Sequence, residues 1–233
     1  MKNESLTYPT MKIMLANHAS FQMGVWLGKG YPVAWLIGPK AWWKTKLHAE
    51  MPYALDNDAF SAWTSGEEWN EPRFYEMLSL ASISYPKPSW VVVPDVVGDK
   101  YKTLESWHQH ASRVAEFKIP LAFAVQDGMT KKDVPHDADV VFVGGTDAWK
   151  WRNLKEWTDN FDRVHVGRVN SLEKVQMCYH LGCESIDGTG WFRDGTESAR
   201  FQRLLRYFHQ DQPKQTTIPL RDGNINGEVR LCR

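Results

Sequence analysis

The sequence contains little cysteine, no long apolar run and no excess of either charge. Its three cysteines, Cys178, Cys183 and Cys232, have an odd count and no framework spacing, which argues against a disulfide-stapled secreted protein. No run approaches the roughly 18 apolar residues of a membrane-spanning helix, and the N-terminus lacks the charged-then-apolar pattern of a signal peptide. We therefore expect a soluble cytoplasmic protein with reduced thiols and no membrane partner.

The charged residues balance at 28 basic against 28 acidic, so no global field attracts a polyanion. Any contact with nucleic acid must therefore come from a local basic face. Tryptophan is abundant, with 12 residues, and several lie in loop-like stretches where an indole can stack on a base. The length is enough for one sizeable core, and we predict a single domain over residues 1–233, of which 211–233 form a polar C-terminal extension.

Eight short and mostly continuous apolar runs lie along the chain. They are residues 12–16, 33–37, 53–55, 90–93, 121–125, 140–143, 164–166 and 185–186. Strands that are buried on both faces, as in a parallel sheet covered by helices, have this continuous apolar pattern. The runs therefore predict eight parallel strands.

Helical spacing fills the later gaps between these runs. Pro72 stands where a first-turn proline belongs, and apolar residues follow it at helical intervals. Similar stripes begin at Leu104, at Leu154, at Leu172 after a possible Ser171 cap, and at Phe201. The alternation predicts an α/β fold, a compact (β/α)8 TIM-like barrel, with an open doubly wound sheet as the alternative. We expect abbreviated first units, because residues 17–52 contain no clean helical pattern.

Polar residues follow several of the predicted strands directly. Asp56, Asp95, Gln126 and Asp187 stand at such ends, as do the Gly144-Gly145 pair and Arg168. For each aspartate alone, a helix cap or a turn is the favoured explanation. Strand ends of one sense meet at the same face of a barrel, where active sites form, so the set predicts one shared site.

Two of these positions suggest particular binding chemistry. Gly144-Gly145 is suited either to a phosphate-binding loop or to close approach of backbone amides to a flat ligand. Gln126 carries a donor and an acceptor in one plane, as an amide that reads the edge of a nucleobase must.

Four segments taken in order resemble the tRNA-guanine transglycosylases. They are Leu55-Asp56-Asn57-Asp58-Ala59-Phe60, Val125-Gln126-Asp127-Gly128, Val143-Gly144-Gly145 and Ser185-Ile186-Asp187. The resemblance covers most of residues 50–190, and its specificity lies in the order of the segments. It implies a TIM barrel that exchanges guanine in a nucleic acid for a 7-deazaguanine base.

The resemblance also implies roles for individual residues. Asp187 would be the nucleophile and Asp56 the acid and base at the departing and arriving bases. Asp95, Gln126 and the Gly144 and Gly145 amides would hold the purine edge, with Phe60 and Arg168 as further substrate-binding residues. A carboxylate that attacks the sugar C1′ and a second that handles the purine proton suffice for this exchange, and no cofactor is implied.

One departure from the family changes the expected substrate. The tRNA enzymes bind zinc through a cysteine cluster and a histidine beyond the last strand, whereas only Cys232 follows Asp187 here, so we expect no zinc subdomain and no metal site. Cys178 and Cys183 are interpreted as helix or core thiols. The shortened chain is similar to the phage-type DNA-guanine transglycosylases. The expected partners are DNA and a free 7-deazaguanine base, tRNA being the less favoured substrate, and the compartment is the host cytoplasm if the protein is phage-encoded.

A duplex substrate requires cations for the backbone and extrusion of the target nucleotide. The candidates for backbone contacts are Lys150, Arg152, Arg193, Arg200 and Arg203. The arginines of the last helix, which continue at Arg206, are equally well explained as a solvated helix face. Trp149, Trp151 and Trp191 lie beside these cations, and each is a candidate either for stacking or for burial.

Three other functions remain open at the level of sequence. They are the same exchange on RNA, a different barrel chemistry such as that of a lyase or phosphate-sugar isomerase, and a catalytically silent nucleic-acid-binding barrel. A strand-end carboxylate at Asp187 favours an enzyme over a binder. Lys100 and Lys150 are predicted to lie in loops, which argues against a Schiff-base aldolase.

Overall fold

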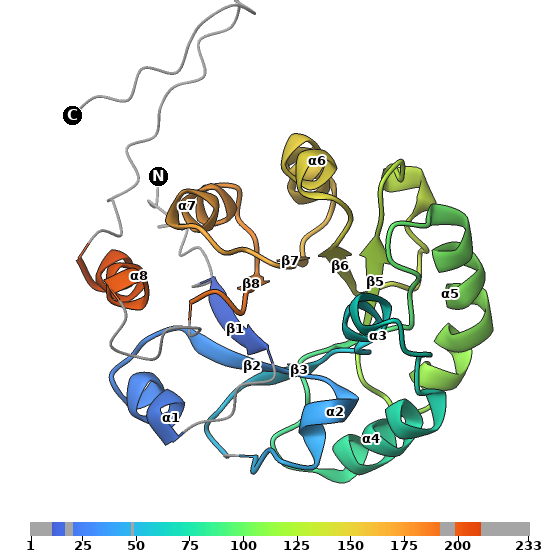
Figure 1. Cartoon of the computed structure of the whole chain (residues 1–233), viewed down its shortest axis with the longest axis horizontal. Coiled ribbons are helices and arrows are strands. Elements are labelled where there is room, and N and C mark those ends of the chain that lie inside the picture. The colour runs from blue at the N-terminus through green and yellow to red at the C-terminus, as the bar shows by residue number, and fades with distance from the viewer. Residues whose placement is uncertain (1–10, 17–20, 48, 192–198, 211–233) are drawn as a thin grey trace, which may run out of the picture.

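The protein forms a closed parallel barrel surrounded by helices (Figure 1). The computed structural model describes the chain except for residues 1–10, 17–20, 48, 192–198 and 211–233. Within the described residues, eight strands pair in sequence order, and β1 closes the barrel by pairing with both β2 and β8. Ile13 is aligned with Val33 on one side and with Ile186 on the other. The predicted (β/α)8 barrel is confirmed, and the open sheet is excluded.

The strands agree closely with the apolar runs of the sequence. They are β1 (Lys12–Ala16), β2 (Val33–Ile37), β3 (Tyr53–Leu55), β4 (Val91–Val92), β5 (Leu121–Val125), β6 (Val140–Val143), β7 (Val164–Val166) and β8 (Ser185–Asp187). Asp187 is itself the last residue of β8 rather than the first residue after it. This places its Cα in the ladder, paired with Met14 of β1.

The helices pack outside the barrel and include a short 3-10 turn, η1 (Lys131–Asp133). They are α1 (Phe21–Gly28), α2 (Pro39–Trp42), α3 (Ala59–Ser65), α4 (Glu71–Ile83), α5 (Lys100–Ala115), α6 (Asp147–Asn160), α7 (Leu172–His180) and α8 (Ala199–Gln210). The predicted caps hold: Pro72 lies in the first turn of α4, and the Ser171 hydroxyl accepts from the Lys174 backbone N–H at the start of α7.

The first units of the barrel are abbreviated but not free of helix. Residues 17–52 contain α1, of eight residues, and α2, of four, where no helix was expected. The Gly38-Pro39 pair that ends β2 also begins α2, because proline is favoured at a first helical position. The prediction of shortened units is therefore confirmed, whereas the prediction that residues 17–52 contain no clean helix was wrong.

Small and large side chains together fill the barrel interior. Its buried cluster combines alanines on β2, β3 and β5 with the indole of Trp90, packed beside Phe142. His165 of β7 is fully buried there, with its ring centroid 4.9 Å from that of Trp90, and its Nδ1 is hydrogen-bonded to the Ser185 hydroxyl at 2.8 Å. Burial lowers the pKa of His165 to about 3, so the imidazole is neutral and serves packing.

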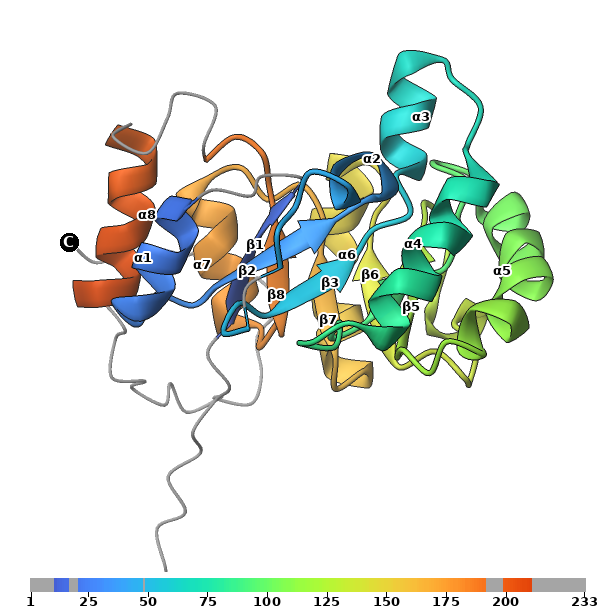
Figure 2. The same cartoon turned by 90° about the horizontal axis from the view of Figure 1, so that it is seen from below.

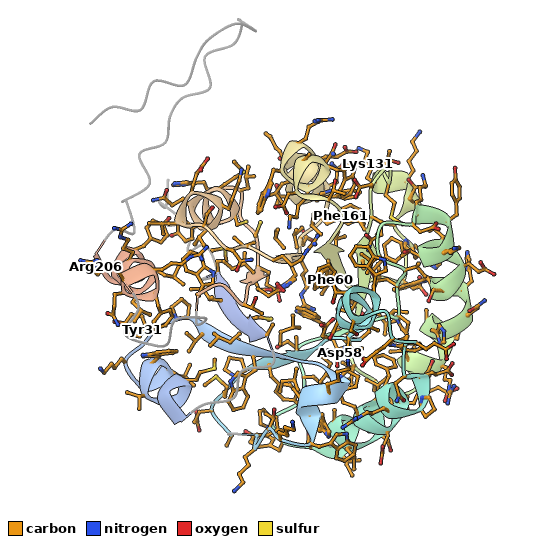
Figure 3. All side chains as sticks on the ribbon, in the orientation of Figure 1. Tyr31, Asp58, Phe60, Lys131, Phe161 and Arg206 are labelled. Atoms are coloured by element: carbon orange, nitrogen blue, oxygen red, sulfur yellow. The ribbon has the colours of Figure 1, made fainter. Side chains whose placement is uncertain are left out.

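Helix α3 differs from the others in its position. It lies inside the ring of the other helices in Figure 1 and projects beyond the body of the protein in Figure 2. Phe60 on this helix points toward the middle of the ring, whereas Arg206 of α8 lies at the periphery (Figure 3). The chain therefore places α3 over the end of the barrel where the polar strand ends gather. No described helix is both long and apolar enough to cross a bilayer.

Candidate active site

The polar strand ends predicted from the sequence surround one cavity of about 480 Å³. This volume lies in the range of about 300–1,000 Å³ that is usual for small-molecule sites. The cavity is lined by every residue proposed for catalysis or base binding: Phe60, Asp56, Asp95, Gln126, Gly144, Gly145, Arg168 and Asp187. The barrel therefore brings together carboxylates that are more than a hundred residues apart in the chain.

Asp187 is held rigidly at the end of β8. Only 7% of it is exposed, its Oδ1 accepts the backbone N–H of Arg168 at 2.6 Å, and its own carbonyl accepts the N–H of Val169 at 2.6 Å. Burial raises its pKa to about 6. The hydrogen bond from the Arg168 N–H and the positive charges of Lys150 and Arg168 act in the opposite direction and lower it. The carboxylate is therefore mainly ionised at neutral pH and able to act as a nucleophile.

Asp56 follows β3, and its surroundings favour its protonated form. Its Oδ1 accepts the backbone N–H of Asn57 at 2.9 Å. Burial raises its pKa well above the ordinary value, and the negative charges of Asp58, Asp187 and Asp95 raise it further. Two carboxyl groups of one cavity thus have environments that suit an acid and a nucleophile respectively.

Asp95 lies between two side-chain amides. Nδ2 of Asn57 donates to its Oδ1 at 2.8 Å, and Nε2 of Gln126 donates to its Oδ2 at 2.7 Å. Burial raises the pKa of Asp95 to about 6, although these two donors favour its charged form. Each oxygen retains capacity for a second hydrogen bond, so the group is a fixed acceptor for the N–H groups of a ligand.

The amides of Gly144 and Gly145 are engaged within the protein, contrary to the expected role. The Gly144 N–H donates to the Val125 carbonyl at 3.1 Å, and the Gly145 N–H donates to Oε1 of Gln126 at 3.2 Å. Neither amide is therefore directed at a purine. The glycines serve close packing instead, because a Cβ on Gly145 would lie 2.6 Å from the Asp127 carboxylate and its φ is +69°.

Gln126 is also more restricted than the sequence implied. Its Oε1 accepts both the Gly98 N–H, at 3.0 Å, and the Gly145 N–H, and its Nε2 donates to Asp95. The carbonyl has no acceptor capacity left, so the expected pairing of donor and acceptor with a base edge does not hold. One N–H remains, and the main effect of the residue is to fix Asp95.

Arg168 and Phe60 form one wall of the cavity. Arg168 has a φ of 60°, which is strained for a residue with a side chain, and its guanidinium donates to the Gly145 carbonyl. The guanidinium carbon lies 4.7 Å from the ring centre of Phe60. Phe60 is 40% exposed and Trp63, one turn along α3, is 63% exposed, with ring centroids 5.8 Å apart. Large exposed aromatics therefore continue outward from the cavity.

Sequence reasoning missed several residues that shape the cavity. Asn57 holds Asp95, and Asn170 accepts the Gly190 N–H at 2.7 Å in the loop that follows β8. Asp58, in the left-handed conformation, accepts the Lys40 N–H at the start of α2. The Asp-Asn-Asp run was a visible signal for Asn57 and Asp58, whereas nothing near Asn170 distinguished it.

The predicted nucleic-acid contacts are only partly placed near the cavity. Lys150 lies in α6 and is fully buried, so its predicted placement in a loop was wrong and its ammonium cannot reach a phosphate. Arg152 is exposed on α6, Arg200 and Arg203 are exposed on α8, and Arg193 lies outside the described residues. Among these, Arg200 is beside the β8 loop, with its guanidinium 5.2 Å from the ring centre of Trp191.

The arginine stripe of α8 lies outside the cavity lining. Gly188 and Thr189 line the cavity, whereas no described residue of α8 does so. Arg203 and Arg206 are thus a solvated helix face. Trp191 is buried and its indole N–H donates to the Val169 carbonyl at 2.7 Å, so burial rather than stacking explains it.

The described cysteines have a structural role. Cys178 of α7 and Cys183 are buried free thiols, as the sequence predicted, and the hydrogen bond to Cys178, together with burial, raises the pKa of Cys183. Within the described ranges, no group of three or more His, Cys, Asp or Glu side chains is arranged to hold a metal ion. No family model and no curated protein matches the chain.

Proposed function

We propose that the protein is a transglycosylase that exchanges guanine in DNA for a 7-deazaguanine base through a covalent bond to Asp187. The observation that carries the proposal is the pair of carboxyl groups in one cavity with different protonation preferences. Asp187 has a pKa of about 6 and is mainly ionised at neutral pH, whereas the pKa of Asp56 is raised well above its ordinary value by burial and by neighbouring charges. A base exchange at an anomeric carbon requires such a nucleophile beside such an acid.

In the first step, a carboxylate oxygen of Asp187 attacks C1′ of the target nucleotide. The bond between C1′ and N9 of guanine breaks, and its electron pair passes to the purine. Asp56 gives its proton to the leaving base, which departs as neutral guanine, and becomes a carboxylate. Asp187 is then esterified to the sugar, as in retaining glycoside chemistry.

In the second step, the incoming 7-deazaguanine loses its N9 proton to the carboxylate of Asp56. N9 attacks C1′, and the bond between C1′ and Asp187 breaks with return of the electron pair to the carboxylate. Asp56 is protonated again, and the two inversions at C1′ restore the original anomer. Neither step requires a redox partner or a cofactor.

Asp95 is suited to recognising the base in both steps. Guanine and 7-deazaguanine share adjacent N–H donors on their Watson–Crick edge, and an acceptor-only carboxylate complements them. The amides of Asn57 and Gln126 hold Asp95 from both sides, at 2.8 and 2.7 Å. Pre-positioned charged acceptors of this kind discriminate strongly against bases that lack the donors, because unpaired buried polar groups are costly.

The rim of the cavity is suited to the bases next to a flipped nucleotide. A guanine in duplex DNA must leave the stack to reach a cavity of this kind. Phe60 and Trp63 expose their rings beside the opening, and aromatic rings of this sort stack on nucleobases without regard to sequence. Arg200, which is exposed beside the β8 loop, is available for a neighbouring phosphate.

The cavity disfavours the phosphate-sugar alternative. Asp56, Asp58, Asp95 and Asp187 line it against one positive side chain, Arg168, so its field repels an anionic group. The Gly144-Gly145 amides, which would have cradled a phosphate, donate within the protein. The remaining rival functions, exchange on tRNA and silent binding, are separated by experiment.

The test is mass spectrometry of nucleosides from duplex DNA and from tRNA, each incubated with the protein and a 7-deazaguanine. The proposal predicts a deazaguanosine in DNA, formed with loss of guanine, and loss of this product in Asp187→Ala and in Asp56→Asn. Asp137→Asn, an exposed site outside the cavity, is the matched control and retains activity. Product in tRNA alone would replace DNA as the substrate, and nucleic-acid binding with no product in either would support a binding protein.

A further inference from the structure

Lys150 is a fully buried lysine that the chemistry above does not use. Its ammonium donates to the carbonyl oxygen of Gly167 over 2.6 Å, lies 3.3 Å from a carboxylate oxygen of Asp147, and stands 4.9 Å from the ring centre of Trp151. Burial of an ammonium group is strongly unfavourable unless it is compensated. An apolar side chain would satisfy a role in packing alone, so the charge itself requires an explanation.

A single peptide group connects Lys150 to Asp187. The peptide between Gly167 and Arg168 accepts from Lys150 through its carbonyl oxygen, and its N–H, on the opposite edge of the same planar unit, donates to Asp187 over 2.6 Å. Arg168 then adopts a φ of 60°, so this orientation needs support from its surroundings. Rotation of the peptide would turn its carbonyl oxygen, rather than its N–H, toward the carboxylate.

Charged groups on several elements face Asp187. Lys150 on α6 and Arg168 after β7 are positive, and both oppose the effect of burial on the pKa of Asp187. Asp56 after β3 and Asp95 after β4 contribute carboxyl groups to the same cavity. The two cations are thus the only positive side chains identified beside this carboxylate within the described residues.

Charged groups also surround Lys150 itself. Burial lowers its pKa, the charge of Arg168 lowers it further, and Asp147 and Asp187 act in the opposite direction. His165 of β7 lies within reach of the same charge but is neutral at functional pH, with a pKa lowered to about 3 by burial and by Lys150. Asp147 is well exposed and screened by water, whereas Asp187 is buried, so the charge of Lys150 is less screened toward Asp187.

We propose that Lys150 is a positioning residue for Asp187, which holds the Gly167–Arg168 peptide with its N–H toward the carboxylate and supplies the buried positive charge that keeps the nucleophile ionised. The catalytic meaning of this link rests on the proposed function. The link itself depends only on the contacts, and a measurement that needs no activity can test it.

The test compares Lys150→Met and Lys150→Gln with a matched control. Lys174 on α7 places its ammonium 4.8 Å from the ring centre of the same Trp151, on a different helix from Lys150. Lys174→Met therefore removes a lysine of the same neighbourhood without breaking the link. Gln at position 150 removes the charge but retains an N–H donor for the Gly167 carbonyl, which separates the charge from the orientation of the peptide.

The readout is the pH titration of the Asp187 carboxyl carbon by NMR, assigned with Asp187→Asn. Lys150→Met is expected to raise the midpoint by one pH unit or more, Lys150→Gln to raise it by less, and Lys174→Met to leave it unchanged. The acid limb of the exchange rate should move by the same amount, with kcat lowered about tenfold or more and KM for the free base within about twofold. An unchanged midpoint in a folded Lys150→Met protein overturns the proposal.

The wild-type protein provides a second test that does not depend on a variant folding. Because the coupling is reciprocal, the side-chain signal of Lys150 must shift with the midpoint of Asp187 and lose this step in Asp187→Asn. A Lys150 signal with no such step contradicts the link. If the Asp187 midpoint shifts in the Lys150 variants but the protein exchanges no base, the proposed function is wrong and the link between Lys150 and Asp187 stands. If the protein exchanges bases but the midpoint does not shift, the proposed function stands and the link is wrong.

Discussion

Gln126 donates from Nε2 to Oδ2 of Asp95 across 2.7 Å, while its Oε1 accepts the amides of Gly98 and Gly145. Three consecutive strand ends, those of β4, β5 and β6, are thereby tied together through one side chain. The consequence is a carboxylate that cannot rotate when a ligand arrives. A carboxylate that is already oriented by its neighbours can select a ligand whose N–H groups match its position.

Asp95→Asn is expected to weaken binding of guanine. The substitution removes one acceptor and places an NH₂ group against Nδ2 of Asn57 or Nε2 of Gln126, both of which are donors. Hydrogen bonds to a charged group contribute about 1.5–3 kcal/mol, so affinity should fall roughly 10- to 150-fold. Calorimetric titration with the free base measures this. Equal affinity in Asp95→Asn and in the exposed control Asp137→Asn would remove Asp95 from base recognition.

Asp187→Asn is expected to stabilise the protein at neutral pH and not at acidic pH. Because the folded-state pKa of Asp187 is raised to about 6, the folded protein binds more protons than the unfolded chain between about pH 4 and 6, and its unfolding free energy falls as pH rises through that window. An asparagine at this position does not titrate, so the variant avoids this fall in unfolding free energy, which amounts to about 3 kcal/mol at most. Urea unfolding at pH 4.5 and 7.5 measures the difference. A stability difference between variant and wild type that is the same at both pH values would show that Asp187 is not buried in this way.

Gly188→Ala is expected to destabilise the loop that follows the nucleophile. An added Cβ would lie 2.4 Å from the backbone carbonyl oxygen of Val169, which cannot move as a side-chain tip can. Overpacking of this kind costs about 1–3 kcal/mol, or roughly 2–4 °C in Tm for each kcal/mol at this chain length.

Gly24→Ala is the matched control for this prediction. It lies within α1, nothing is within 4 Å of its added Cβ, and helix propensity predicts a gain of up to about 1 kcal/mol. Thermal unfolding of both variants measures the difference. A Tm for Gly188→Ala at or above that of the wild type would mean that the loop has room for a Cβ beside the Val169 carbonyl.

Trp63→Ala is expected to weaken binding of DNA and to leave binding of the free base unchanged. Its ring is 63% exposed one turn beyond Phe60, outside the cavity lining. Stacking of one base contributes about 1–3 kcal/mol, so the affinity for DNA should fall roughly 5- to 150-fold. Trp43→Ala removes another exposed tryptophan, which is 45% exposed, lies beside Pro72 and Arg73 rather than in the cavity lining, and should bind DNA as the wild type does. Equal DNA affinity for both variants would exclude α3 from the interface.

The strands were predictable because strands buried on both faces leave continuous apolar runs between Gly, Pro and Asp. Residues 121–125 and 140–143 match β5 and β6 to the residue. Helix α3 was not predictable in this way, because Phe60 and Trp63 are exposed and only Ala59 and Ala62 are buried. A helix without an apolar stripe gives no periodic signal.

The convergence of carboxylates followed from topology, but their hydrogen-bond partners did not. Whether the Gly145 amide meets a ligand or Gln126 depends on the relative depth of two strand ends, which no local pattern encodes. Lys150 shows a signal that was available and overlooked. It precedes Leu154 and Trp157 by four and seven residues, which places it on the buried face of α6.

The most direct measurement of the central claim is detection of the covalent intermediate on Asp187. The protein is incubated with duplex DNA, denatured, and analysed for a protein–DNA adduct whose attachment site is identified by peptide mapping. The account predicts one adduct, located at Asp187, discharged by added 7-deazaguanine and absent in Asp187→Ala. Full base exchange by Asp187→Ala, or an adduct located at another residue, would contradict it.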